Sequence, residues 1–92
     1  MITGFIGTGS MGSVLIEAFI RSGALRSDQI IATNRTLAKV ERLALKFPGL
    51  QVAEFSNEVA NACDILFICV KPADFPRVIA DIAMSCRSEQ IM

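Results

Sequence analysis

The feature that most constrains the fold of this chain is the glycine pattern after its first apolar run. Residues 1–6 are mostly apolar, and the sequence then reads Gly7-Thr8-Gly9-Ser10-Met11-Gly12. Beyond the second glycine of this pattern, apolar residues recur at helical spacing, at Met11, Val14, Leu15, Ala18 and Phe19. A strand, a glycine-rich turn and a helix in this order predict a dinucleotide-binding unit.

Each glycine of the pattern has its own expected role. Gly7 allows a tight turn, Gly9 lets the backbone approach a pyrophosphate, and Gly12 lets the helix pack closely on the strand because it has no Cβ. The start of the helix adds N–H groups and partial positive charge toward the phosphates. These are backbone interactions, so the motif predicts binding rather than catalysis.

Strands and helices continue to alternate along the rest of the chain. The patterns predict strands at residues 29–33, 50–53 and 64–70, and helices at residues 37–47, 57–61 and 75–83. Gly23 is expected to end the first helix in a left-handed conformation, and Ser56 to cap the third. Residues 90–92 are similar to the start of a further strand. We therefore predict an α/β fold, a Rossmann-type doubly wound parallel sheet of about four to five strands with helices on both faces, truncated at its end.

Composition narrows the function classes. The 92 residues have a formal net charge of zero and are 52% hydrophobic, which favours one folded domain over residues 1–92 and gives no basic stripe for nucleic acid. No apolar run reaches the roughly 20 residues of a membrane span, and no charged region precedes the first apolar run. We therefore expect no membrane association and a cytoplasmic location.

The residue types in this chain do not suggest a metal site or a catalytic site. The chain has no histidine, and Cys63, Cys69 and Cys86 form no C-x-x-C pair, so no metal site is predicted and the cysteines are expected to be buried. Neither a paired acid and base nor a hydrolase triad is present. We predict no catalytic residue.

The residues after the second strand bear on the choice of nucleotide. An NAD site usually has Asp or Glu about 20 residues beyond the glycines, whereas this chain has Asn34-Arg35-Thr36 with no carboxylate nearby in the sequence. Arg35 can pair with a 2′-phosphate, and Asn34 and Thr36 can donate hydrogen bonds to it. The pattern predicts NADP(H), with NAD(H) still possible. The alternative is that Arg35 is a solvated residue at the start of a helix.

The longest apolar run ends at Val70-Lys71-Pro72. The carboxyl end of a parallel strand beside the glycine loop is where ligands bind in open α/β sheets, so we expect Lys71 near the nucleotide. Asn57, at the start of the third helix, is expected to face the same cleft. The alternatives are a solvated lysine at a strand end and an asparagine that caps its helix.

Together these motifs resemble the N-terminal domain of the pyrroline-5-carboxylate reductase family over essentially the whole chain. Valine-lysine-proline after the fourth strand is the more specific part, and Ser56-Asn57-Glu58 adds to it. The resemblance implies hydride transfer from NAD(P)H to 1-pyrroline-5-carboxylate, the last step of proline synthesis. It implies a cofactor site of Ile6, Gly7, Thr8, Gly9, Ser10, Met11, Asn34, Arg35, Asn57, Cys69, Val70, Lys71 and Pro72. Cys69 departs from the small residue usual in the family.

The resemblance also implies parts that these residues do not contain. The family has an all-helical C-terminal domain that forms the dimer and supplies the substrate pocket. A small-molecule substrate and a homo-oligomer are therefore expected for the full-length protein, and cofactor binding without reductase activity for residues 1–92 alone. Three alternatives stay open. They are a β-hydroxyacid dehydrogenase, in which leucine-proline is typical after the fourth strand, a competence-operon reductase-like paralogue, and a nucleotide-sensing domain without catalysis.

Overall fold

The structure, a computed structural model, describes residues 1–82, with Ser10, Met11 and Asp81 described by their backbone only. Four strands form one parallel sheet in the order β3-β2-β1-β4. They are β1 (Thr3–Ile6), β2 (Ile30–Thr33), β3 (Gln51–Val52) and β4 (Ile65–Ile68). In the register of the sheet, Gly4 lies between Ile31 and Leu66. The parallel α/β prediction is confirmed, and the strand predicted at residues 90–92 lies outside the described residues.

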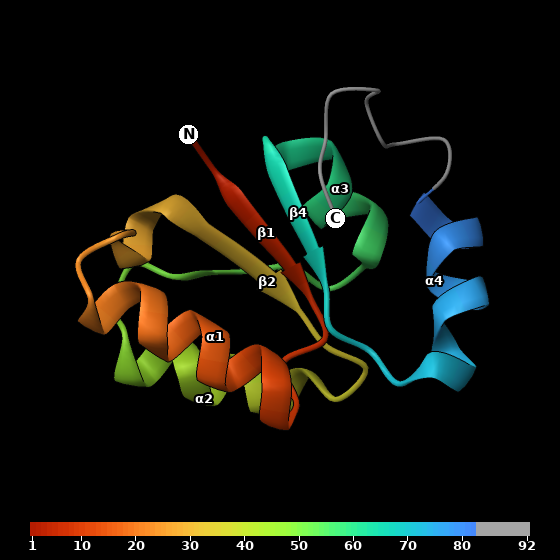
Figure 1. The fold of residues 1–92 in the computed structure, drawn as a ribbon, viewed down its shortest axis with the longest axis horizontal. Helices are drawn as coiled ribbons and strands as arrows, with labels where there is room; N and C mark the ends of the chain where they lie inside the picture. Colours follow the sequence, from red (N-terminus) through yellow and green to blue (C-terminus); the bar gives the residue numbers. More distant parts are fainter. Residues whose placement is uncertain (83–92) are drawn as a thin grey trace.

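Helices cover both faces of this sheet, as the doubly wound prediction requires (Figure 1). The first two, α1 (Ser10–Arg21) and α2 (Leu37–Lys46), pack on one face, and α3 (Ser56–Ala62) and α4 (Phe75–Ile82) pack on the other. Two short 3₁₀ turns, η1 (Ser27–Gln29) and η2 (Pro72–Asp74), lead into β2 and α4. This is the Rossmann-type arrangement.

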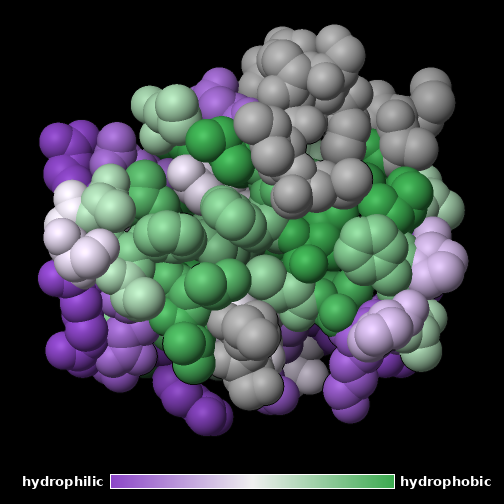
Figure 2. Space-filling model, in the orientation of Figure 1, coloured by the Kyte–Doolittle hydropathy of each residue, from purple (hydrophilic) through white to green (hydrophobic). Residues whose placement is uncertain are grey.

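Alternation along the strands divides the core into two layers. Phe5 faces α1 and α2, where it packs with Ile16 and Val40, whereas Ile6 faces α3 and α4 with Val59. The Phe5 ring stacks on Phe67 with centroids 5.1 Å apart. Apolar side chains gather over the middle of the face between α1 and α4 (Figure 2). The two layers fix the sheet against its helices and so fix the loops at its carboxyl edge.

Several local predictions differ from the structure. Val14, one of the apolar residues at helical spacing, is 62% exposed, because the buried stripe of α1 runs through Ile16. Phe55 rather than Ser56 precedes α3, and its N–H donates to Glu58 Oε1 at 3.0 Å. The fourth strand ends at Ile68, earlier than predicted, since the chain turns there into the loop that leads to η2. Gly23 has the expected positive φ, at 81°.

The predicted burial of the cysteines holds in part. Cys63 is fully buried against the sheet, Cys69 is half-buried, and Cys86 lies outside the described residues. Within residues 1–82, the longest helix has 12 residues, too short to cross a bilayer. The same part of the chain contains no group of three or more His, Cys, Asp or Glu side chains that could hold a metal ion.

Candidate functional site

A cleft of about 830 Å³ opens at the carboxyl ends of the strands. β1 lies between β2 and β4, and the chain crosses from one side of β1 to the other between β3 and β4. The loops after β1 and β4 therefore part here, at the topological switch point where open α/β sheets bind ligands. The cleft is lined by Ile6, Gly7, Gly9, Thr33, Asn34, Arg35, Thr36, Leu37, Lys39, Glu54, Phe55, Ser56, Asn57, Cys69, Val70, Lys71, Asp74, Arg77 and Val78.

The glycine loop has the geometry that its sequence predicts. Gly7 has a φ of 95°, and its N–H donates to the Thr33 carbonyl at 2.9 Å. A Cβ on Gly12 would overlap the carbonyl oxygen of Gly7, so the start of α1 lies against the loop. No described atom lies within 4 Å of the place that a Cβ on Gly9 would take. The loop is thus closed toward the protein at Gly7 and Gly12 and open toward solvent at Gly9.

Thr8 contributes a buried hydroxyl beside the first turn of α1. Its side chain is 1% exposed, and Oγ1 has no hydrogen-bond partner among the described residues. Its carbonyl accepts a hydrogen bond from Ser13 Oγ at 2.6 Å. A buried hydroxyl without a partner is uncommon in folded proteins. Together with the N–H groups of the first helical turn, which have no acceptor within the helix, it gives this loop donors for a phosphate.

A second, shallower groove of about 400 Å³ lies between α1 and α2. Thr8 lines this groove rather than the main cleft, and Gly9 and Lys39 line both. The open side of the glycine loop therefore faces a continuous surface from the end of β4 around to α2. An extended ligand with two phosphates fits such a surface better than a compact one.

Asn34 holds the glycine loop to the end of β2. Its Oδ1 accepts from the Thr8 N–H at 3.0 Å, and its Nδ2 donates to the Thr36 carbonyl at 3.1 Å. The sequence suggested this amide as a donor to a 2′-phosphate, but in the structure the amide is engaged in joining two loops. Asn34 lines the cleft as predicted, with a role that positions the loop.

Arg35 meets a carboxylate that its sequence neighbourhood does not contain. Asp74 Oδ1, from the turn before α4, lies 3.6 Å from Arg35 Nη1. No carboxylate is near Arg35 in the sequence, but the parallel sheet brings the end of β2 and the start of α4 to one edge and so places Asp74 beside it. The Arg35 side chain is still 72% exposed and reachable by a ligand.

The end of β4 forms the opposite wall. The Cys69 N–H donates to the Ile6 carbonyl at 2.7 Å, and burial raises the pKa of the Cys69 thiol, which stays neutral at pH 7. Cys69, Val70 and Lys71 line the cleft as predicted, and so does Asn57 from α3. The residues that line it give an apolar wall at β4 and a polar rim.

Three predicted site residues with described side chains or backbone, Thr8, Gly12 and Pro72, are not among those that line the main cleft. Gly12 supports the loop from behind, Thr8 lines the neighbouring groove, and Pro72 begins η2. Ser10 and Met11 begin α1 with their backbone, and their side chains lie outside what the structure describes.

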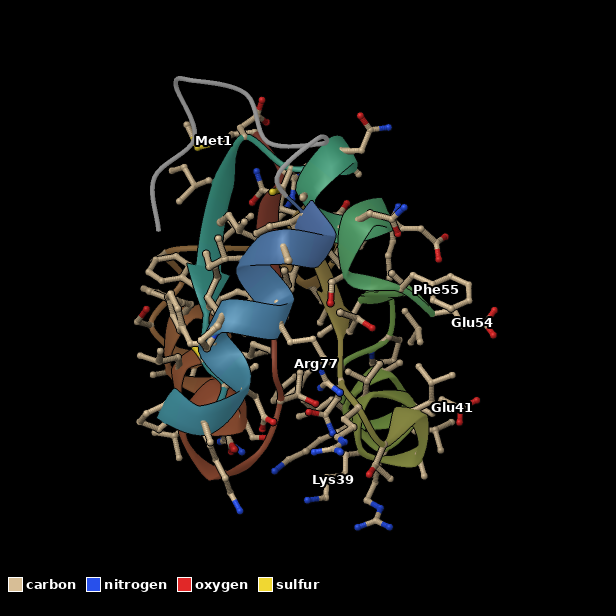
Figure 3. The ribbon with its side chains drawn as sticks, turned by 90° about the vertical axis from the view of Figure 1, so that its right-hand side faces the viewer. Met1, Lys39, Glu41, Glu54, Phe55 and Arg77 are labelled. Atoms are coloured by element: carbon tan, nitrogen blue, oxygen red, sulfur yellow. The ribbon has the colours of Figure 1, made fainter. Side chains whose placement is uncertain are left out.

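Sequence reasoning missed the contribution of α2 and α4. Lys39, Asp74 and Arg77 line the cleft, and none stands next to a recognised motif. In Figure 3, Arg77 on α4 and Lys39 on α2 extend toward the same space, whereas Glu41 points outward. One signal was available: the first turns of helices that follow parallel strands all lie at the ligand edge of the sheet.

The cleft is positive although the whole chain is neutral. Four basic residues and two acidic residues line it, against a net charge of zero over 92 residues. A local excess of positive charge in a cleft attracts anionic ligands. Glycine loop, unpartnered Thr8 hydroxyl and basic rim together fit a ligand that carries several phosphates.

Fold and cleft together define this chain as a dinucleotide-binding domain. The statistical model of the family described as "NADP oxidoreductase coenzyme F420-dependent" matches residues 2–92. The chain belongs to that family.

Two relatives show which proteins of known name the chain resembles. The chain is 36% identical over 92 residues to ComE operon protein 4 of Bacillus subtilis (strain 168), covering all of this chain and 34% of that protein. It is 35% identical over 89 residues to pyrroline-5-carboxylate reductase of Escherichia coli (strain K12), covering 97% of this chain and 33% of that one. The chain thus spans about a third of the length of these relatives.

A solved structure agrees in fold. An imine reductase from Myxococcus stipitatus in complex with NADP⁺ superposes with a TM-score of 0.80 at 28% identity, covering 99% of this chain and 30% of that one. The resemblance to the pyrroline-5-carboxylate reductase family is confirmed by these likenesses.

Proposed function

We propose that this chain is the NADP(H)-binding domain of an imine-reducing oxidoreductase of the pyrroline-5-carboxylate reductase type. The observation that carries the proposal is the exposed Arg35 guanidinium at the end of β2, across the cleft from the end of β4 and beside a glycine loop with an unpartnered buried hydroxyl. A planar guanidinium suits a phosphate monoester. The imine reductase with 28% identity is solved with NADP⁺, which supports the same choice.

Different residues would hold different parts of such a cofactor. Gly9 and the first turn of α1 would face the pyrophosphate, and Arg35 with Thr36 would face the 2′-phosphate. Ile6, Cys69 and Val70 would give the apolar wall that excludes water along the end of β4. When bound, the reduced nicotinamide supplies a hydride. No residue of the chain is assigned a proton-transfer role.

Reduction of a cyclic imine is proposed for a longer protein that includes this domain. The supporting likeness is to proteins about three times as long as this chain. A small-molecule substrate, a homo-oligomer and a cytoplasmic location belong to the same proposal. The free thiol of Cys69 agrees with a reducing compartment.

Comparative titration tests the cofactor choice. NADPH and NADH are titrated into the 92-residue chain by calorimetry, and we expect NADPH to bind more tightly. Arg35→Gln should weaken NADPH about tenfold or more, because it removes a charge-assisted contact, and should change NADH little. Arg26→Gln is the matched control, since Arg26 is exposed and pairs with Asp28 away from the cleft. Equal affinities for the two cofactors, or tighter NADH, would contradict the proposal.

A further inference from the structure

Asp74 crosses the cleft to reach the residue expected to recognise the 2′-phosphate. It ends η2, directly before α4, and its carboxylate lies 3.6 Å from the Arg35 guanidinium at the far side of the opening. The Asp74 side chain is 29% exposed and Arg35 is 72% exposed, so the carboxylate is the more enclosed partner. The ion pair joins the end of β2 to the start of α4.

This pair places two anions in competition for one guanidinium. A 2′-phosphate carries about −1.5 to −2 charges near neutral pH and takes the same planar fork that a carboxylate takes. A phosphate that binds Arg35 therefore displaces Asp74 or stays beside it at a cost in repulsion. NADH carries no such phosphate and leaves the pair intact.

Arg77 offers Asp74 a second partner. It stands three residues further along the continuous turn of η2 and α4, a spacing at which helical side chains are neighbours. Arg77 also lines the cleft, and its side chain extends into it (Figure 3). Among the side chains that the structure describes, which do not include Asp81, Arg77 forms no ion pair.

We propose that Asp74 determines specificity at the adenosine end of the site by exchanging partners. Asp74 pairs with Arg35 when no 2′-phosphate is present and moves to Arg77 when the phosphate takes Arg35. The Asp74 carboxylate thereby lowers the preference for NADP(H) over NAD(H), and Arg77 makes this decrease in preference smaller. This inference rests on the proposed function, because it concerns the same nucleotide site.

The test is a double-mutant cycle on the 92-residue chain. Dissociation constants of NADPH and NADH are measured for wild type, Asp74→Asn, Arg77→Gln and the double variant. Adenosine 2′,5′-bisphosphate and AMP are added as probes that carry only the adenosine end. Asp74→Asn should tighten NADPH and the bisphosphate about two- to fivefold, the range for a partly exposed ion pair, and leave NADH and AMP unchanged or weaker.

Arg77→Gln distinguishes partner exchange from direct phosphate contact. With Asp74 present, this variant should weaken NADPH about two- to fivefold, because Asp74 loses its second partner. In the Asp74→Asn background it should have no effect. An equal effect of Arg77→Gln in both backgrounds means that Arg77 contacts the phosphate itself and overturns the exchange.

Controls separate charge from position and folding. Glu41→Gln removes the same charge from an exposed residue of α2 that points away from the cleft (Figure 3), and it should leave the NADPH to NADH ratio unchanged. Asp74→Ser, checked by circular dichroism, replaces Asp74→Asn should the latter not fold. An unchanged ratio in folded Asp74 variants overturns this inference alone, whereas a wild-type chain that binds neither cofactor overturns the proposed function with it.

Discussion

The glycines of the loop after β1 differ in what surrounds them, in line with the separate roles expected from the motif. A Cβ on Gly12 would overlap the Gly7 carbonyl oxygen, whereas a Cβ on Gly9 would project into open space. Gly12 is thus required by the fold. Gly9 has no packing reason to be glycine, which leaves the approach of a ligand as its reason.

Alanine at these two positions separates stability from binding. Gly9→Ala should change the free energy of unfolding by about 1 kcal/mol or less, the cost of a poorer helix cap, and weaken NADPH binding at least about tenfold. Gly12→Ala should lower the free energy of unfolding by about 1–3 kcal/mol through overpacking. Urea unfolding and calorimetry measure both quantities. Full NADPH affinity in Gly9→Ala would contradict the role given to this loop.

The Cys69 thiol allows a pH measurement at the apolar wall of the cleft. Burial raises its pKa, and the thiolate is the reactive form, so alkylation by iodoacetamide should be slow at pH 7 and rise only above the ordinary thiol value of about 8.5. Mass spectrometry of the Cys69 peptide follows the rate, with fully buried Cys63 as the slower control. NADPH should slow it further. Rapid alkylation at pH 7 would show that the thiol is not enclosed.

The same raised pKa gives a direction for stability. The folded state holds the Cys69 proton more tightly than the unfolded state. Its contribution is therefore fully present below the ordinary thiol pKa and is lost as the pH rises through the raised value.

At the scale of elements, α1 and α2 are joined at the surface through one carboxylate. Glu17 lies 3.2 Å from Lys46 of α2 and 2.8 Å from Arg21 of its own helix. The hydrogen bonds to Lys46 and then Arg21 lower the pKa of Glu17. This contribution is present above the ordinary glutamate pKa and is lost as the pH falls through the lowered value.

Glu17→Gln should therefore lower the melting temperature slightly at pH 7 and low salt. The difference in melting temperature from wild type should shrink in 1 M salt, where the screening length is about 3 Å. It should also shrink at acid pH, where a protonated Glu17 is as neutral as the glutamine that replaces it. Glu41→Gln, with no ion pair among residues 1–82, is the control for charge alone. Differential scanning calorimetry at two salt concentrations measures the difference in melting temperature. A difference that persists at high salt would mean that the side chain of Glu17 stabilises the fold by packing instead of by charge.

An element could be predicted from the sequence when the residues that determine it lie within one short stretch of the chain. The strand, loop and helix at residues 3–21 were predictable because the glycine spacing and the apolar period lie in one stretch. Asn34, Asn57 and Lys71 could be placed at one edge because parallel strands end together. The contact of Asp74 with Arg35 could not be predicted, since it depends on the angle at which α4 leaves β4. The Phe55 cap was missed because its hydrogen bond runs from the Phe55 backbone N–H to the Glu58 carboxylate and involves no polar side chain at the capping position.

At the scale of the whole molecule, the described cleft brings together groups that suit nucleotide binding: a glycine loop, a basic rim and an apolar wall. The apolar wall of the cleft is formed by Ile6, Val70 and Cys69, whose thiol is neutral. The chain also spans only about a third of the length of its relatives. We therefore expect binding and hydride transfer to be separable in this chain.

The separation is measured on one preparation of the 92-residue chain. NADPH at a hundredfold its dissociation constant should stabilise the fold by about 2.7 kcal/mol, which raises the melting temperature. With pyrroline-5-carboxylate added, the absorbance of the reduced nicotinamide should fall no faster than without protein, because the residues that contact the imine are expected elsewhere. Arg35→Gln provides the control, since it should reduce the thermal shift without altering that baseline. Oxidation of NADPH above the baseline would show that residues 1–92 already hold both the hydride donor and its acceptor.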